Sequence, residues 1–188
     1  MVRGCYDILC LDNLPVISQH LARLELYGVQ LLDNFLNFSS CPALQHVEFG
    51  RCELCCGMIS SRSLKLLSII DCKFVDMRRT RIYVPNLVSL RLDGFYRRVP
   101  VLDRVPLLVE AFVRVTHSTG CCVDNNGDLS DEHCDLCYGI KDGTNCLLLD
   151  GLSEAKTLSL IDEAKSVNLH VNSVIFSLYQ LLDIDEDA

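Results

Sequence analysis

The side chains best suited to metal chemistry lie between residues 117 and 146. Zinc takes four thiolate or imidazole ligands in a tetrahedron, and two of them commonly come from a C-x-x-C pair. Cys134 and Cys137 have that spacing, and either Cys121 or Cys122, together with Cys146, could complete the set. A second C-x-x-C pair is missing, so the sequence favours an insertion loop with free thiols over a zinc site. We therefore expect no bound metal and no other cofactor.

A possible calcium site lies in the same stretch. The residues Asp124-Asn-Asn-Gly-Asp128 look like the start of an EF-hand loop. Such a loop needs glycine at its sixth position and a bidentate glutamate at its twelfth. Those positions hold Leu129 and Asp135. The mismatch predicts an acidic excursion between two regular segments, and not a calcium-binding loop.

Residues that could carry out catalysis are hard to find. The chain has no G-x-S-x-G, no P-loop glycine pattern and no H-E-x-x-H, which are spacings of common hydrolase, nucleotide-binding and metalloprotease sites. The C-x-x-C formed by Cys52 and Cys55 lacks the βαβ surroundings of a thiol-redox motif. We therefore predict that the protein is not an enzyme.

Composition and charge narrow the class of partner. The 188 residues carry a formal net charge of −8, with +3 in residues 1–118 and −11 in residues 119–188. Nucleic-acid contacts need clustered Lys and Arg, so nucleic acid is not expected as a partner. The chain shows neither a long apolar run that would span a membrane nor a signal peptide. The expected location is cytoplasmic, nuclear or both, where the 12 cysteines would be thiols.

The architecture is indicated by a repeated L-x-x-L-x-L pattern. Its copies begin at Leu21, Leu44, Leu64, Leu87 and Leu108, with a degenerate copy at Ala155. Successive starts are 23, 20, 23, 21 and 47 residues apart. A period of about 20–29 residues with this pattern is typical of leucine-rich repeats. The chain is predicted to be an α/β leucine-rich-repeat solenoid, with a parallel sheet on the concave face and irregular or short helical returns.

Each repeat predicts one strand of that sheet. The last two apolar positions of the pattern are two residues apart, so they face the same side of a strand and stack with those of neighbouring repeats. We expect strands near residues 22–27, 45–49, 65–70, 88–93 and 109–114. Leu67, Leu90 and Leu92 should be buried. Cys52 and Cys72 follow their strands in a slot where a small polar side chain can bond backbone groups.

Several runs of residues carry a family resemblance. They are Leu24-Glu-Leu-Tyr-Gly-Val-Gln-Leu, Phe38-Ser-Ser-Cys-Pro-Ala-Leu, Ser63-Leu-Lys-Leu-Leu-Ser-Ile-Ile-Asp-Cys72, Pro85-Asn-Leu-Val-Ser-Leu-Arg-Leu-Asp-Gly-Phe95 and Gly151-Leu-Ser-Glu-Ala155. Over about residues 14–162 the chain resembles the repeat region of plant, especially grass, F-box/leucine-rich-repeat proteins. The resemblance implies the substrate-recognition arm of a ubiquitin-ligase receptor. It also implies a Cys- and Asp-rich insertion before the G-L-S-E-A segment, which matches 117–146.

The resemblance sets expectations for domain organisation. Family members begin with an F-box, a short helical module that opens on L-P-x-x-[LI] and docks the Skp adaptor of a cullin ubiquitin ligase. Here Leu14-Pro15 lies directly before a repeat strand, so we expect the F-box, and with it adaptor binding, to be absent. The predicted organisation is one repeat domain over residues 1–188, an insertion loop at 117–146 and a divergent acidic segment at 165–188.

Function is expected to reside in the side chains that point out from the concave sheet. A surface that mixes Tyr, Phe, Arg and carboxylates suits protein recognition. The candidate partner-binding residues are Arg23, Glu25, Tyr27, His46, Glu48, Ser68, Arg91, Asp93, Glu110, Phe112 and Arg114. The sequence thus predicts a protein-binding module whose partner is a protein of unknown identity. Two alternatives stay open: a truncated, non-functional remnant or gene-model fragment, and a metal-binding regulatory module built on the cysteine cluster.

Overall fold

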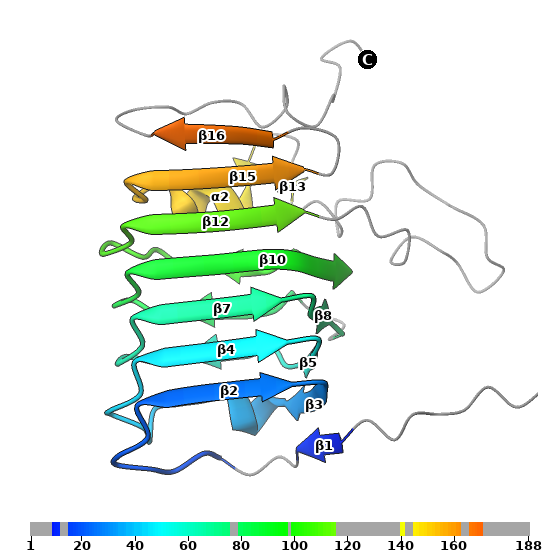
Figure 1. Cartoon of the computed structure of the whole chain (residues 1–188), viewed down its shortest axis with the longest axis vertical. Helices are drawn as coiled ribbons and strands as arrows, with labels where there is room; N and C mark the ends of the chain where they lie inside the picture. Colours follow the sequence, from blue (N-terminus) through cyan, green and yellow to red (C-terminus); the bar gives the residue numbers. More distant parts are fainter. Residues whose placement is uncertain are drawn as a thin grey trace, which may run out of the picture.

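The computed structural model describes residues 9–11, 15–75, 79–97, 99–115, 140–141, 145–162 and 166–170. Within them the backbone winds as a parallel β-solenoid of about four turns (Figure 1). The main sheet stacks parallel strands from successive repeats and ends on an antiparallel strand, β16. Its strands are β2 (Arg23–Tyr27), β4 (His46–Gly50), β7 (Leu66–Ile70), β10 (Ser89–Arg97), β12 (Glu110–Val115), β15 (Thr157–Asp162) and β16 (Ser166–His170).

Two further rows of short parallel strands form the returns between the main-sheet strands. The second row contains, in order, β1 (Leu9–Leu11), β3 (Val29–Leu32), β5 (Glu53–Cys55) and β8 (Lys73–Phe74). Its last member is the C-terminal end of β10, which pairs with β8. The third row contains β6 (Met58–Ser60), β9 (Arg81–Tyr83) and β11 (Val101–Leu102). A full turn therefore passes from the main sheet to the second row, then to the third row and back.

Helical structure is scarce in the described part of the chain. It consists of the 3-10 helix η1 (Asp33–Leu36) and the six-residue helix α2 (Leu147–Leu152), which follows the antiparallel pair β13 (Ile140–Lys141) and β14 (Asn145–Cys146). Short strands thus occupy most returns where irregular or short helical segments were expected. Alternate residues of β5 and β6 are buried, which is the burial pattern of a strand. None of the described helices is long and apolar enough to cross a membrane.

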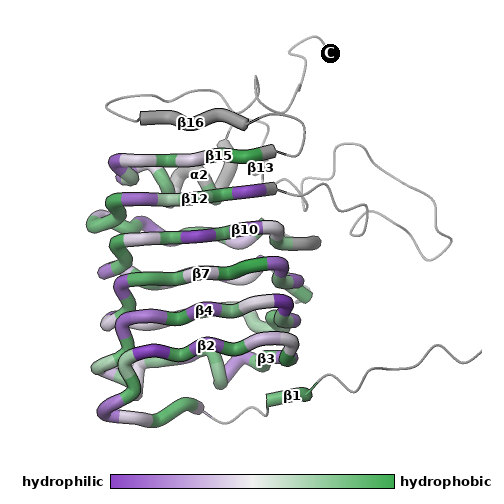
Figure 2. Tube along the Cα trace, in the orientation of Figure 1, coloured by the Kyte–Doolittle hydropathy of each residue, from purple (hydrophilic) through white to green (hydrophobic). Residues whose placement is uncertain are grey.

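The predicted main-sheet strands and their inward residues are confirmed. Each of the five expected strands is present, although β10 continues to Arg97 beyond its expected end. Leu67 and Leu90 are 1% exposed and Leu92 is 0% exposed. Figure 2 shows hydrophobic and hydrophilic residues alternating along these strands. The inward residues of successive repeats therefore form one continuous core, as a solenoid requires.

The degenerate repeat at Ala155 supplies a true strand of the main sheet. β12 and β15 pair directly, with Ala111 opposite Leu158 and Val113 opposite Leu160. The repeats that begin at residues 108 and 155 are therefore neighbours in space. Although their starts are 47 residues apart, no other strand of the main sheet lies between β12 and β15. Residues 116–139, which include the rejected calcium loop, lie outside the described part.

One backbone corner recurs in four successive repeats: it directly follows β2, β4 and β7, and it lies within β10 where the register with β12 shifts. Gly28, Arg51, Asp71 and Gly94 have φ values of 65°, 53°, 51° and 67°, in the left-handed region that glycine tolerates best. The N–H of Gly28 donates to the carbonyl of Gly50 at 2.9 Å, and the N–H of Asp71 donates to the carbonyl of Asp93 at 2.7 Å. The corner residues thus continue the inter-strand bonding into the turn.

Cys52 and Cys72 occupy the slot after the corner and bond backbone groups there, as predicted. Both are buried. The Cys72 Sγ lies 3.4 Å from the carbonyl oxygen of Phe49 and 3.3 Å from that of Ile70, and it accepts a bond from the Cys52 N–H at 3.4 Å. The hydrogen bond with the Cys52 side chain raises the pKa of Cys72, and burial raises that pKa further. The two thiols therefore link neighbouring turns of the solenoid.

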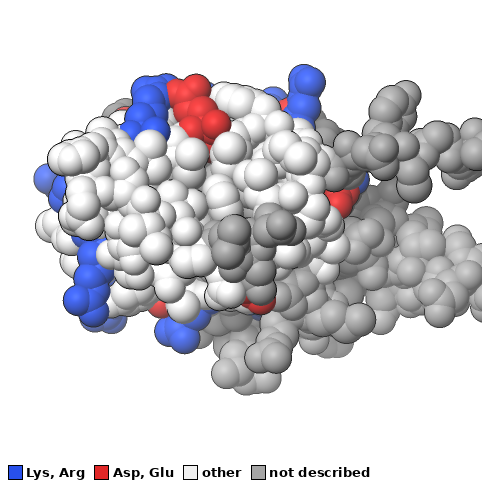
Figure 3. All heavy atoms as spheres, turned by 90° about the horizontal axis from the view of Figure 1, so that it is seen from below, with Lys and Arg blue, Asp and Glu red and all other residues white. Residues whose placement is uncertain are grey.

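The N-terminal end of the solenoid is less well covered than its middle. Leu24 and Leu26 on β2 are partly exposed, whereas Val47 and Phe49 opposite them on β4 are 0% exposed. Figure 3 looks at this end, where the described surface is mostly uncharged and its charged groups lie toward the edges. The described residues that precede the first repeat therefore cover its inward side only partly.

Candidate functional site: the outward face of the main sheet

The outward face of the main sheet carries every residue predicted to bind a partner. Because the strands pair in register, alternate residues line up in three rows across the sheet. The first row is Arg23, His46, Leu66, Ser89, Glu110 and Thr157. The second is Glu25, Glu48, Ser68, Arg91, Phe112 and Ser159. The third is Tyr27, Gly50, Ile70, Asp93, Arg114 and Ile161.

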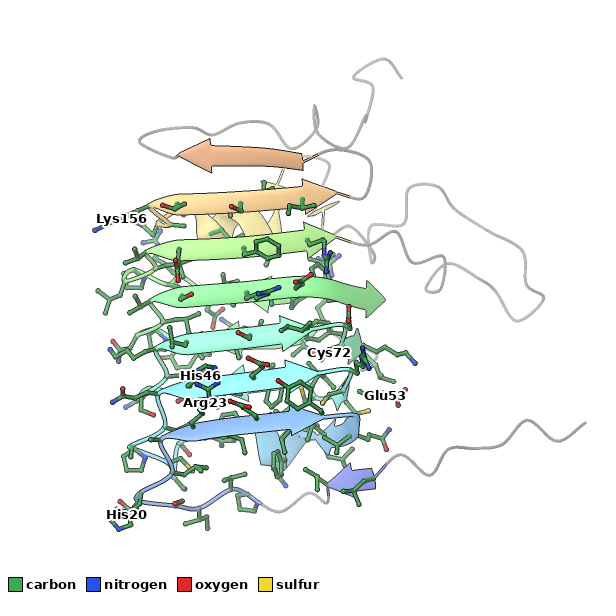
Figure 4. All side chains as sticks on the ribbon, viewed as in Figure 1. His20, Arg23, His46, Glu53, Cys72 and Lys156 are labelled. Atoms are coloured by element: carbon green, nitrogen blue, oxygen red, sulfur yellow. The ribbon has the colours of Figure 1, made fainter. Side chains whose placement is uncertain are left out.

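The N-terminal end of this face holds an acidic site, defined as Arg23, Glu25, Tyr27 and Glu48. Figure 4 labels Arg23 of this site and the neighbouring His46. The two glutamates occupy facing positions on β2 and β4. Arg23 donates to Glu25, and the Tyr27 hydroxyl donates to Glu48. The hydrogen bond to Glu48 raises the pKa of Tyr27. One arginine against two carboxylates leaves this site with a formal charge of −1.

The ring of Tyr27 is held at this site by a glycine on the next strand. A β-carbon at Gly50 would collide with the Cδ1 and Cε1 atoms of the Tyr27 ring. Gly50 therefore lets the ring lie across β4 and reach Glu48. Gly50 was not among the residues that the sequence pattern indicated as functional. The available signal was a glycine at an outward strand position where other repeats carry side chains.

His46 lies beside the acidic site without joining its hydrogen bonds. Its Nε2 is 3.9 Å from the nearer Glu48 oxygen, which is too far for a hydrogen bond. That nitrogen is enclosed and has no partner among the described residues.

The C-terminal half of the face holds a basic site, defined as Arg91, Asp93, Phe112 and Arg114. The Asp93 carboxylate is 1% exposed and accepts from Arg91 Nη2 at 2.6 Å and from Arg114 Nη2 at 2.5 Å. The guanidinium of Arg91 also lies 5.2 Å from the centre of the Phe112 ring, within the range of a cation–π contact. Two arginines against one carboxylate leave this site with a formal charge of +1.

A neutral strip separates the two sites. It is the outward side of β7, where Leu66 is 39% exposed and Ser68 and Ile70 are partly exposed. Strand β7 lies between β4 and β10 in the sheet. The acidic site, the neutral strip and the basic site thus follow one another along the solenoid axis, and Glu110 lies in the first row of β12 outside the basic site.

The residues considered for metal binding are not assembled into a site by the described structure. Cys121, Cys134 and Cys137 lie outside the described residues, and Cys146 is described only as the last residue of β14. Among the described residues, no group of three or more His, Cys, Asp or Glu side chains is placed to hold a metal ion. The expectation that this chain binds no zinc therefore rests on the spacing of its cysteines.

Comparisons with known proteins do not identify a family for this chain. A scan against protein-family models finds no match, and searches of curated proteins and of solved structures find none either. The outward face itself is thus the basis for any functional conclusion.

Proposed function

We propose that this chain is a non-catalytic protein-binding module that recognises its partner through the outward face of the main sheet. The observation that carries the proposal is the pre-arranged outward face. The Tyr27–Glu48 hydrogen bond and the Arg91–Asp93–Arg114 cluster hold aromatic and charged side chains in place. Fixed side chains lose less conformational entropy on binding than mobile ones. Tyr and Arg are also the residue types that contribute most at protein interfaces.

The finer assignment within this proposal is a leucine-rich-repeat arm that resembles the substrate-recognition part of an F-box ubiquitin-ligase receptor. The 20–23-residue spacing of the first five repeats and the buried cysteine slot support it. In this proposal the repeats bind a protein substrate in the cytoplasm or nucleus, and they do not themselves bind the Skp adaptor. The outward face of the described strands carries both signs of charge, and its two neighbouring arginines, Arg91 and Arg114, share the carboxylate of Asp93. This mixture favours protein over nucleic acid or an anionic membrane.

Affinity capture with matched variants tests the proposal. The wild-type chain is compared with Ser68→Arg, which places a long side chain at the centre of the face and removes no ion pair of the described structure. Arg62→Glu serves as the control, because Arg62 is exposed and lies outside the three rows. A specific partner should be lost with Ser68→Arg and kept with Arg62→Glu, while both variants melt like the wild type. Equal capture by all three chains would contradict the proposal.

A further inference from the structure

Charge divides the outward face along the solenoid axis. The acidic site spans β2 and β4, the basic site spans β10 and β12, and the neutral strip of β7 lies between them. A partner that lies along one strand would meet at most one of the two sites. A partner that crosses the strands would meet the acidic site, the neutral strip and the basic site in order.

The separation of the two sites matches a short stretch of extended chain. Neighbouring strands lie about 4.8 Å apart, so three strand spacings between the centres of the sites amount to about 14 Å. An extended peptide advances about 3.3–3.4 Å per residue, so four residues cover about the same distance. Side chains four residues apart could therefore reach both sites at once.

Resting on the proposed function, we infer that the outward face binds an extended peptide segment that crosses the strands and carries one basic and one acidic residue four positions apart. The Lys or Arg of the segment pairs with Glu25 and Glu48. Its Asp or Glu pairs with Arg91 and Arg114. The residues between them are small or apolar and lie against Leu66 and Ile70.

Both sites keep bonding capacity for such a segment. A guanidinium has five N–H donors, and the bonds to Asp93 use two groups of each arginine, Nε and Nη2. The side chains of Arg91 and Arg114 are 51% and 44% exposed, so their other donors can reach a second carboxylate. At the acidic site one arginine offsets only one of the two carboxylates, and the side chains of Glu25 and Glu48 are 38% and 21% exposed. Charge pairs of this kind fix orientation and partner choice more than raw affinity.

A single extended chain fits this face better than a second copy of the protein. Leu66 and Ile70, the apolar residues of the neutral strip, lie on a single strand. A stable dimer interface buries roughly 800 Å² on each partner around an apolar centre. Self-association of the 188-residue chain through this face, abolished by Ser68→Arg, would therefore overturn the inference.

Selection from a random twelve-residue peptide library displayed on phage tests the inference. The full chain is the bait, and each selected peptide is re-tested on Ser68→Arg. Selected peptides should lose binding to Ser68→Arg and should show a basic and an acidic residue four positions apart about fivefold more often than the unselected library. Peptides that lose binding but lack this spacing overturn the inference and leave the proposed function standing. Peptides that ignore Ser68→Arg, or the absence of any enriched peptide, overturn both.

A charge exchange with one selected peptide tests the assigned polarity. Glu48→Lys should weaken binding about tenfold, and replacing the basic residue of the peptide by Glu should restore it. Glu53→Lys is the control, because it makes the same charge change on β5, away from the outward face. A restored affinity cannot come from misfolding. Equal loss with Glu48→Lys and Glu53→Lys, or no restoration, would overturn the pairing of the peptide cation with the acidic site.

Discussion

Asp93 on β10 and Arg114 on β12 occupy facing positions on adjacent strands, and their side chains form an ion pair of 2.5 Å. Arg91, two residues before Asp93, holds the other carboxylate oxygen at 2.6 Å. A buried carboxylate is costly unless a cation compensates it. Because Asp93 has two such cations, either arginine alone can keep it paired, and the second is available for a partner.

This redundancy predicts non-additive mutations. Arg91→Met or Arg114→Met alone should cost at most about 1 kcal/mol, since the other arginine still pairs with Asp93. The double variant should cost about 3–5 kcal/mol, the loss typical of a buried charge left alone. Chemical denaturation of the four chains gives the coupling directly. Adding Asp93→Asn to the double variant should recover much of the loss, because a neutral amide needs no cation.

The core stack makes a second prediction. Leu90 is 1% exposed and lies between Leu67 and Ala111 on neighbouring strands. Leu90→Ala should reduce the free energy of unfolding by about 2–5 kcal/mol through lost burial and the cavity left behind. Ser89→Ala on the outward side of the same strand is the control and should change stability by less than about 0.5 kcal/mol. A loss of less than about 1 kcal/mol in the free energy of unfolding for Leu90→Ala would contradict the placement of Leu90 in a stacked core.

The sequence pattern was sufficient for the strands and for the direction of their side chains. Once Leu67 and Leu90 are placed inward, the alternation of a strand puts Ser68 and Arg91 outward, and a nearly fixed repeat length brings them into register. The secondary structure of the returns could not be predicted in the same way. Segments as short as β5 and β6 are too brief for a period to separate strand from helix.

The candidate residues could be predicted from the sequence, but their partners could not. That Asp93 would be buried between two arginines depends on the register of β10 with β12, with residues 93 and 114 opposite each other. The repeats that supply them are spaced by 21 residues, but other repeats are spaced by 20 or 23. The length of the return does not fix the register by itself. The packing of Tyr27 over Gly50 also depends on strand register, because the two residues are neighbours only when β2 and β4 are aligned as observed.

The recurrent backbone corner makes a third prediction. Arg51 has a φ of 53°, where a side chain with a β-carbon is strained by roughly 1–2 kcal/mol. Arg51→Gly should therefore stabilise the protein, by about 0.5–1 kcal/mol after the greater backbone entropy of glycine in the unfolded chain is counted. Arg51→Ala is the matched control, since it removes the same side chain but keeps the β-carbon. A gain of equal size with alanine would show that the arginine side chain, and not the backbone, is the cause.

Metal removal makes a fourth prediction, which rests on the sequence alone. Because the cysteines of 117–146 offer one C-x-x-C pair and no second one, treatment with a strong zinc chelator should leave the thermal midpoint unchanged. The same should hold for a calcium chelator, because Leu129 and Asp135 stand where a calcium loop needs Gly and Glu. Metal analysis of the purified chain is the direct measurement. One equivalent of zinc, lost in the Cys134→Ser and Cys137→Ser double variant, would refute this prediction.

The buried thiol of Cys72 predicts how stability responds to alkaline pH. Its pKa in the folded protein is raised above the ordinary 9.0 by the hydrogen bond with Cys52 and by burial. Below pH 9 the thiol is protonated in both the folded and unfolded chains, and its contribution to stability is fully present. Above pH 9 the unfolded chain releases this proton and the folded chain retains it. Stability then falls with a slope of up to about 1.4 kcal/mol per pH unit.

The comparison of the wild type with Cys72→Ala isolates this effect, because lysines and tyrosines titrate in the same range in both proteins. Urea unfolding between pH 7 and pH 10.5 should show the wild type ahead of the variant by a margin that is largest near pH 9. The margin grows from pH 7 to pH 9 because the hydrogen bond with Cys72 lowers the pKa of Cys52 to about 7 in the folded wild type. That margin should shrink above pH 9, because only the wild type carries the retained proton. Cys10→Ala removes an exposed thiol and should follow the wild-type profile. A margin that stays constant from pH 9 to pH 10.5 would show that the Cys72 proton is not held by the fold.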